Sequence, residues 1–188
     1  MSLMEASPRG SRARVMTNWY VVTGGPSSGK TTTVNLLRER GYKTTIEHAR
    51  HFIDTQCVTG RTVTEIRANQ MAFQKGVLDM QMEQERIIDC DELYFLDRAL
   101  PDAFAYYRFL NLTPEPRLVE ALTEVAYKKA FVLDLLPLVS DYARTEDSDA
   151  QVRIHALIVE VYESLKIVVE HVPVLPAVAR VDFMLARL

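Results

Sequence analysis

The fold is decided by residues 18–40, which read NWYVVTGGPSSGKTTTVNLLRER. Residues 19–22 are apolar and rich in β-branched and aromatic side chains, as expected of a central strand in a parallel sheet. Residues 24–31 then match the pattern G-x-x-x-x-G-K-[ST], and a helical pattern follows that stops near Gly41. A serine-rich turn that caps a helix is the simpler interpretation. The strand before the loop and the helix after it favour a phosphate-binding loop.

Each residue type in this loop has a physical reason. Gly24 and Gly29 permit backbone angles and a close approach that a Cβ atom would prevent. Backbone N–H groups wrap the phosphate, Lys30 neutralises outer phosphate charge, and the hydroxyl group of Thr31 coordinates Mg²⁺. The start of the helix adds the positive end of its dipole. The predicted nucleotide-binding residues are Gly24, Gly25, Pro26, Ser27, Ser28, Gly29, Lys30, Thr31 and Thr32.

The composition is that of an ordinary globular protein. The chain has 188 residues, of which 48% are hydrophobic, and this length suffices for one core. The net charge of -3 provides no basic field, so no nucleic-acid partner is expected. Cys57 and Cys90 lie outside any C-x-x-C pattern, which indicates reduced thiols in a cytosolic protein. No apolar stretch is long enough to span a bilayer, so we expect a cytoplasmic protein without a membrane partner; an oligomer is possible.

The chain is expected to have two parts. Residues 1–17 carry several arginines but lack the continuous apolar segment that a signal peptide requires, so they are predicted to be a disordered leader. Residues 18–188 are predicted to form one nucleotide-binding domain.

Strand and helix patterns alternate along the rest of the chain. Further strands are predicted at residues 42–46, 93–96, 130–136 and 168–174. Residues 51–61 look like a polar connection, and a capping box of Thr62 and Glu65 opens a long helix that continues to about Asp89. Later helices are predicted from Pro101, from Thr113, around residues 154–165 and over residues 176–188. This alternation predicts an α/β fold in which helices cover a parallel sheet.

Polar residues follow the ends of these strands, where ligands of an open parallel sheet collect. The second strand is followed by Glu47 and Arg50, the third by Asp97 and Arg98, and the fourth by a loop with Arg144. Asp97 comes directly after four apolar residues, as expected of the acid that holds Mg²⁺ in phosphate-loop enzymes. Thr31 and Asp97 are therefore the predicted metal site, and an ordinary strand-end aspartate is the alternative.

The predicted catalytic residues are Lys30, Glu47, Arg98 and Arg144. Arg98 and Arg144 would clamp phosphate oxygens, although each alone would also fit a surface salt bridge. Glu47 would accept a proton from an acceptor hydroxyl group, or instead pair with Arg50. Core packing is the expected role of Tyr106 and Tyr107, and a structural role is expected of His48, His51, His155 and His171.

Five segments together resemble a known group: GGPSSGKTT, EHAR, FLDRALPDAFAYYR, DYARTED and VPVLPAVAR. They are similar to small P-loop proteins of the AAA type related to the kinase domain of NadR, and to the wider thymidylate kinase and deoxynucleoside kinase group. The resemblance covers residues 19–188. It implies a three-layer P-loop NTPase fold with a five-stranded parallel sheet in the order 2-3-1-4-5. It also implies ATP as phosphate donor, adenine near residues 173–180, a lid with Arg144, and Glu47 in the place of the kinase base.

Two classes of function fit these residues. The first is a Mg²⁺- and ATP-dependent kinase of a small nucleoside- or nucleotide-like metabolite. The second is an ATPase or a nucleotide-dependent switch that acts through a protein partner. Motor-type ATPases usually need a glutamate after the strand-end aspartate, where this chain has Arg98, and the N-K-x-D pattern of GTPase switches does not occur. The sequence therefore favours the kinase, and no segment identifies the acceptor.

Overall fold

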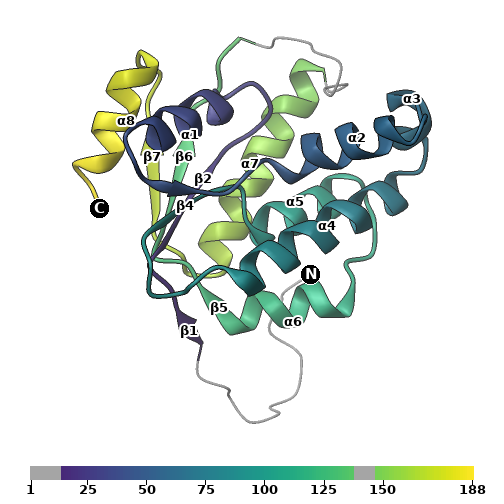
Figure 1. The fold of residues 1–188 in the computed structure, drawn as a ribbon, viewed down its shortest axis with the longest axis horizontal. Helices are drawn as coiled ribbons and strands as arrows, with labels where there is room; N and C mark the ends of the chain where they lie inside the picture. The colour runs from purple at the N-terminus through teal and green to yellow at the C-terminus, as the bar shows by residue number, and fades with distance from the viewer. Residues whose placement is uncertain (1–13, 138–146) are drawn as a thin grey trace.

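A parallel sheet with helices on both faces forms the centre of the molecule in the computed structural model, which describes residues 14–137 and 147–188 (Figure 1). Its five strands run in the order β3-β4-β2-β6-β7. They are β2 (Trp19–Thr23), β3 (Lys43–Thr44), β4 (Tyr94–Asp97), β6 (Lys129–Leu133) and β7 (Val169–Val172). In chain order this is 2-3-1-4-5, so the predicted sheet is confirmed, although β3, β6 and β7 are shorter than expected.

The central strand β2 is buried along its whole length and lies between β4 and β6. Val22 pairs with Asp97 of β4 on one side and with Phe131 of β6 on the other. Because all three strands are parallel, their carboxyl ends meet at one edge of the sheet. This register places the loop that follows β2 beside Asp97.

Alternate residues of β2 pack into two separate cores, as the period of a strand requires. Tyr20 and Val22 face α1 (Lys30–Glu39) and α8 (Ala177–Leu185). Trp19 and Val21 face the larger core, to which α4 (Gln70–Ile87), α5 (Leu100–Phe109), α6 (Pro116–Glu124) and α7 (Ser148–Ser164) contribute. The sheet and its two helical layers therefore form the predicted α/β architecture (Figure 1).

Two sequence predictions about the helices were wrong. Residues 51–61 are not a connection, because α2 (His48–Val58) buries Ile53 against Ile66 and Phe73. The long helix predicted from residue 62 to 89 is divided into α3 (Val63–Ala68) and α4. At the break, Asn69 leaves helical geometry and its side chain caps the backbone N–H of Ala72 at 3.0 Å. The capping box of Thr62 and Glu65 is present as predicted.

Gly76 explains how closely α2 packs on α4. A Cβ atom at position 76 would lie only 2.2 Å from the ring of Phe52. The glycine therefore costs α4 some helix propensity but allows α2 to lie against it. This contact packs α2, whose first residue is His48 and whose N-cap is Glu47, against α4.

The boundary of the predicted leader also needs correction. Val15 and Met16 form β1 (Val15–Met16), which pairs in parallel with β5 (Val125–Ala126). The guanidinium group of Arg14 donates hydrogen bonds to the carbonyl groups of Leu122 and Leu165, both at 3.1 Å. Residues 14–17 thus belong to the domain, while residues 1–13 lie outside the described part. Among the described helices, none combines the length and apolar character needed to cross a membrane.

Candidate functional site

The loop between β2 and α1 has the backbone that its glycines predicted. Gly24 and Gly29 have φ angles of 134° and 82°, which side chains rarely allow. A Cβ atom at Gly24 would also lie 2.6 Å from the carbonyl oxygen of Leu133. The loop therefore approaches β6 closely, and it ends at the first turn of α1 with Gly29 as the N-cap.

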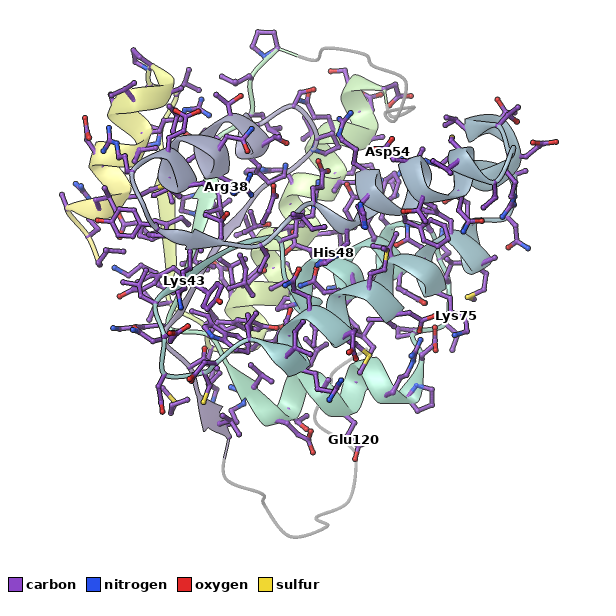
Figure 2. All side chains as sticks on the ribbon, viewed as in Figure 1. Arg38, Lys43, His48, Asp54, Lys75 and Glu120 are labelled. Carbon is purple, nitrogen blue, oxygen red and sulfur yellow. The ribbon has the colours of Figure 1, made fainter. Side chains whose placement is uncertain are left out.

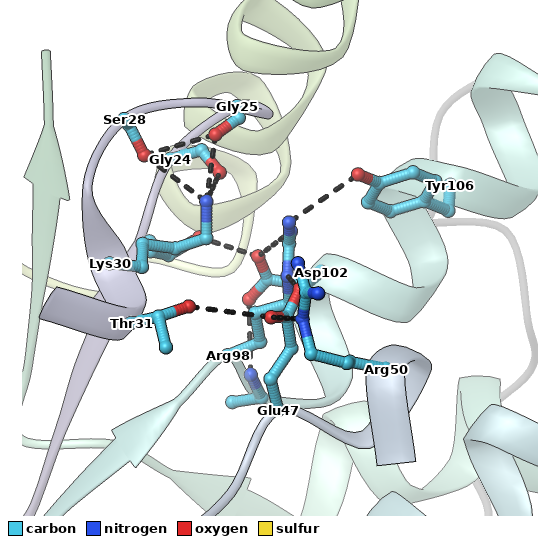
Figure 3. Close-up of polar contacts among 12 residues, drawn as sticks. Gly24, Gly25, Ser28, Lys30, Thr31, Glu47, Arg50, Arg98, Asp102 and Tyr106 are labelled. Atoms are coloured by element: carbon cyan, nitrogen blue, oxygen red, sulfur yellow. Dashed lines mark hydrogen bonds and ion pairs between the residues drawn. The ribbon is translucent and has the colours of Figure 1, made fainter. Parts of the chain in front are cut away.

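Lys30 folds back into the curve of this loop (Figure 3). Its Nζ donates hydrogen bonds to the carbonyl oxygens of Gly24 at 2.9 Å and Gly25 at 2.7 Å, and to Ser28 Oγ at 3.1 Å. Burial lowers the pKa of Lys30, and the nearby charge of Arg98 lowers it further. A desolvated ammonium group in this position would gain strongly from an anion, as the phosphate-loop motif requires.

Asp97 lies buried at the end of β4, as predicted. Its backbone N–H donates to Thr45 Oγ1 at 2.9 Å, but its side-chain Oδ1 is buried and has no hydrogen-bond partner within the described residues. Burial and the charge of Glu47 raise the pKa of this carboxyl group. A buried carboxylate oxygen without a partner suits a hard cation. Asp97 and the exposed hydroxyl group of Thr31 therefore fit a Mg²⁺ ion.

Replacing Asp97 by asparagine tests this fit. We expect Asp97→Asn to weaken ATP binding with Mg²⁺ by about tenfold or more, because the amide keeps the shape but loses the charge that the cation requires. Binding in EDTA should change little. Calorimetric titrations with ATP under both conditions make the comparison, and equal losses in both would identify a structural aspartate.

Glu47 lies between the phosphate loop and two arginines (Figure 3). Its Oε2 accepts a hydrogen bond from Thr31 Oγ1 at 3.5 Å and lies 3.6 Å from Arg50 Nε. Its Oε1 lies 3.9 Å from Arg98 Nε. The structure thus brings together Thr31, Glu47 and Arg98, three of the predicted site residues, and it includes the predicted alternative pairing with Arg50.

Arg98 adopts a left-handed backbone, with φ 67°, directly after Asp97. Its Nη1 lies 3.4 Å from Asp102 Oδ1, and its Nη2 lies 3.5 Å from the hydroxyl oxygen of Tyr106. Burial opposes its charge, but Tyr106 and Asp102 raise the pKa of Arg98 above its ordinary value. Arg98 therefore stays charged in the site. Tyr107 packs in the core as predicted, whereas Tyr106 contacts this arginine.

Asp102 is a site residue that the sequence did not reveal. This buried carboxylate accepts hydrogen bonds from Thr23 Oγ1, from the hydroxyl group of Tyr162 at 2.6 Å and from the backbone N–H of Ala99 at 3.1 Å. It thereby ties the end of β2 to α5 and α7, and it orients Arg98. An acid in the first turn of a helix is a common capping residue, so its position alone gave no sign of this role.

A cavity opens next to Glu47 between α2, α4 and α5. Its walls are largely apolar, with Ile53, Phe73 and Val77 among the lining residues. Two buried polar side chains also line it, His48 and Gln74, and neither makes a hydrogen bond within the described residues. In Figure 2, His48 lies near the centre of the molecule. Burial lowers the pKa of His48 to about 4, so the imidazole is neutral.

Two of the histidines lie at the site, and the structural role predicted for all four stays a prediction. His48 lines the cavity, and Nδ1 of His155 accepts the backbone N–H of Gly25 at 3.2 Å. Neither histidine belongs to a sequence motif, so the sequence did not predict these two contacts. Arg144 and its loop neighbours Asp141 and Glu146 lie outside the described residues, so the clamp predicted for Arg144 stays a prediction.

Comparisons with known proteins agree with this architecture. A family model described as an AAA domain matches residues 19–179. No similar sequence was found among the curated proteins. A deoxyadenosine kinase from M. mycoides, solved with the products dCMP and dCDP, superposes with a TM-score of 0.61 at 12% identity, over 90% of this chain and 97% of that one.

Two further solved structures have the same fold. NadR in complex with NR gives a TM-score of 0.61 at 18% identity over 84% of this chain, which spans only 46% of NadR. A thymidylate kinase from Candida albicans gives 0.57 at 13% identity, over 93% of this chain and 92% of that one. The predicted resemblance to P-loop kinases and the predicted fold class are thereby confirmed.

Proposed function

Because this chain belongs to the AAA domain family and has the fold of P-loop kinases, we propose that it is a cytoplasmic, Mg²⁺-dependent kinase. It transfers the γ-phosphate of ATP to a small nucleoside- or nucleotide-like acceptor. One observation carries the proposal: Glu47 contacts Thr31 of the phosphate loop and also lines the cavity beside it. A donor phosphate in the loop and an acceptor in the cavity would therefore meet at this carboxylate.

The site residues divide the reaction between them. Lys30 and Arg98 stabilise negative charge on the transferring phosphoryl group, and Glu47 takes the proton from the acceptor hydroxyl group as its oxygen attacks. Thr31 and Asp97 would hold Mg²⁺, which would neutralise charge on the phosphate oxygens. Arg144 stays the predicted additional clamp. Phosphoryl transfer needs mainly positioning and charge neutralisation, and this set of residues is suited to both.

The acceptor cavity favours a planar ring with polar edges. The guanidinium carbon of Arg67 lies 4.4 Å from the centre of the Phe73 ring. Phe73, Ile53 and Val77 form the apolar wall of the cavity. Gln74 offers a hydrogen-bond donor and an acceptor in one plane, and the neutral His48 offers one of each. Buried polar groups without partners are costly, so a heterocycle with complementary edges would gain affinity by pairing with them.

An acceptor panel tests the proposal. We expect ADP formation from ATP to rise at least about tenfold with a nucleoside, a nucleoside monophosphate or ribosylnicotinamide, because closure around an acceptor excludes water and aligns the hydroxyl group. Ribose, which lacks the planar heterocycle, should not stimulate. Gln74→Leu should raise the KM of the acceptor and leave the KM of ATP unchanged.

Gln84→Leu is the matched control, since Gln84 lies on the same helix but does not line the cavity. A lack of stimulation by every acceptor that carries a planar heterocycle would contradict the proposed kinase activity. Stimulation with an unchanged acceptor KM in Gln74→Leu would instead contradict only the assignment of the cavity.

A further inference from the structure

The backbone carbonyl groups of the phosphate loop need partners of their own. A loop that turns its N–H groups toward a phosphate must turn many of its C=O groups outward, into the protein. Buried carbonyl groups are rarely left without a hydrogen bond, because each unpaired group costs free energy. The donors that face these carbonyl groups therefore help to decide which way the loop amides point.

Three consecutive carbonyl groups of the loop have such outer donors. Pro26 O accepts from Gln151 Nε2 at 2.8 Å, Ser27 O from the backbone N–H of Leu136 at 3.2 Å, and Ser28 O from Arg180 Nη1 at 2.6 Å. Two of the donors are side chains, one on α7 and one on α8. The loop is thus bonded to elements that follow it by more than a hundred residues.

Gln151 ties the loop to the segment after β6. This buried amide, in the first turns of α7, also donates to the carbonyl oxygen of Leu136 at 3.0 Å. The backbone N–H of Leu136 in turn donates to the carbonyl oxygen of Ser27, the residue after Pro26. Gln151, Leu136 and the loop are therefore linked in a ring of hydrogen bonds. Rotation of the Pro26 carbonyl group would break its hydrogen bond to Gln151, which favours the observed orientation of the loop.

Arg180 contacts the loop at Ser28 and Gly29. A Cβ atom at Gly29 would be 2.9 Å from Arg180 Nη1, so the second loop glycine makes room for the guanidinium group. Arg180 is 2% exposed, and its Nε and Nη2 make no hydrogen bond within the described residues. Burial lowers its pKa. Burying the charged guanidinium group of Arg180 costs desolvation free energy. Its charge beside the loop would also add to the positive potential at the phosphate site.

Lys30 also bonds to carbonyl groups of the loop, but it is part of the ligand site itself. Its Nζ bonds to the carbonyl groups of Gly24 and Gly25 from inside the curve, and it must leave them to reach the outer phosphates. Gln151 and Arg180 instead bond to the carbonyl groups of Pro26 and Ser28, which Lys30 does not contact. We propose that Gln151 and Arg180 are positioning residues that hold the phosphate loop ready for nucleotide. The inference rests on nucleotide binding by the proposed function and not on the acceptor.

Calorimetry with ATP and with inorganic tripolyphosphate, both with Mg²⁺, tests this role. Gln151→Leu and Arg180→Met should each weaken both ligands by about tenfold, roughly the effect of losing one hydrogen bond to a buried group. The loss should be alike for the two ligands because it concerns only the phosphates. Arg180→Lys, which keeps a charge and one donor, should bind more tightly than Arg180→Met.

Arg40→Met is the matched control, because the ion pair of Arg40 with Asp182 at 2.6 Å also joins α1 to α8 but does not contact the loop. It should bind both ligands as the unmodified protein does. Binding within twofold of normal in Gln151→Leu and Arg180→Met would overturn the proposal, and so would a loss for ATP without one for tripolyphosphate. Failure of the unmodified protein to bind ATP would instead reject the proposed function itself.

Discussion

Lys30→Ala should weaken the binding of ATP with Mg²⁺ by at least about a hundredfold, because the loop loses the cation that points into its curve. The ammonium group is buried, and its pKa is lowered by that burial, so an anionic phosphate is the partner that would restore its ordinary ionisation. The truncation also removes three hydrogen bonds that order the loop. Calorimetric titration with ATP measures the effect.

Lys43→Ala serves as the control for Lys30. Lys43 is exposed on the short edge strand β3, where it pairs with Glu92, so its loss should leave ATP binding unchanged (Figure 2). If Lys30→Ala bound ATP within threefold of the unmodified protein, the loop would not be the phosphate site. The proposed kinase activity, which depends on phosphate binding by this loop, would then be rejected as well.

Glu47→Gln should lower the acceptor-dependent rate by about a hundredfold to ten-thousandfold, the range expected for the loss of a general base. The amide keeps the length of the side chain but cannot accept the proton of the acceptor hydroxyl group. Since Glu47 contacts Thr31 only at 3.5 Å, the affinity for ATP should change by less than about threefold. Steady-state kinetics with a stimulating acceptor separate the two effects.

Asp54→Asn is the control for Glu47, because Asp54 is an exposed acid on the same helix α2. Its rate should match that of the unmodified protein. A Glu47→Gln variant with a normal acceptor-dependent rate would rule out Glu47 as the base. The carboxylate would then serve only to orient Arg50 and Arg98.

The sequence predicted the centre of the fold well because its signals there are local. A phosphate loop is defined by eight consecutive residues, and the strand before it is a continuous apolar run that only a covered sheet accommodates. Asp97 was placed correctly for the same reason, as an acid that directly follows an apolar strand. The strand order came from the resemblance to P-loop kinases, not from the residues of any one strand.

What the sequence did not predict depends on contacts between distant segments. α2 was missed because the buried Ile53 and the partly buried Phe52 stand in a polar run and pack against residues of α3 and α4. The break at Asn69 was missed because the apolar spacing continues through it. Gln74, Gln151 and Arg180 belong to no motif, and their roles become visible only when the cavity and the loop are brought beside them.

The fate of the γ-phosphate tests the central claim most directly. The protein is incubated with ATP, Mg²⁺ and the most stimulating acceptor, and ADP, free phosphate and phosphorylated acceptor are quantified in the same sample. The kinase account predicts one phosphorylated acceptor for each ADP and little free phosphate, because the closed site excludes water. Free phosphate equal to ADP, with no phosphorylated acceptor, would contradict the account and favour an ATPase or a switch.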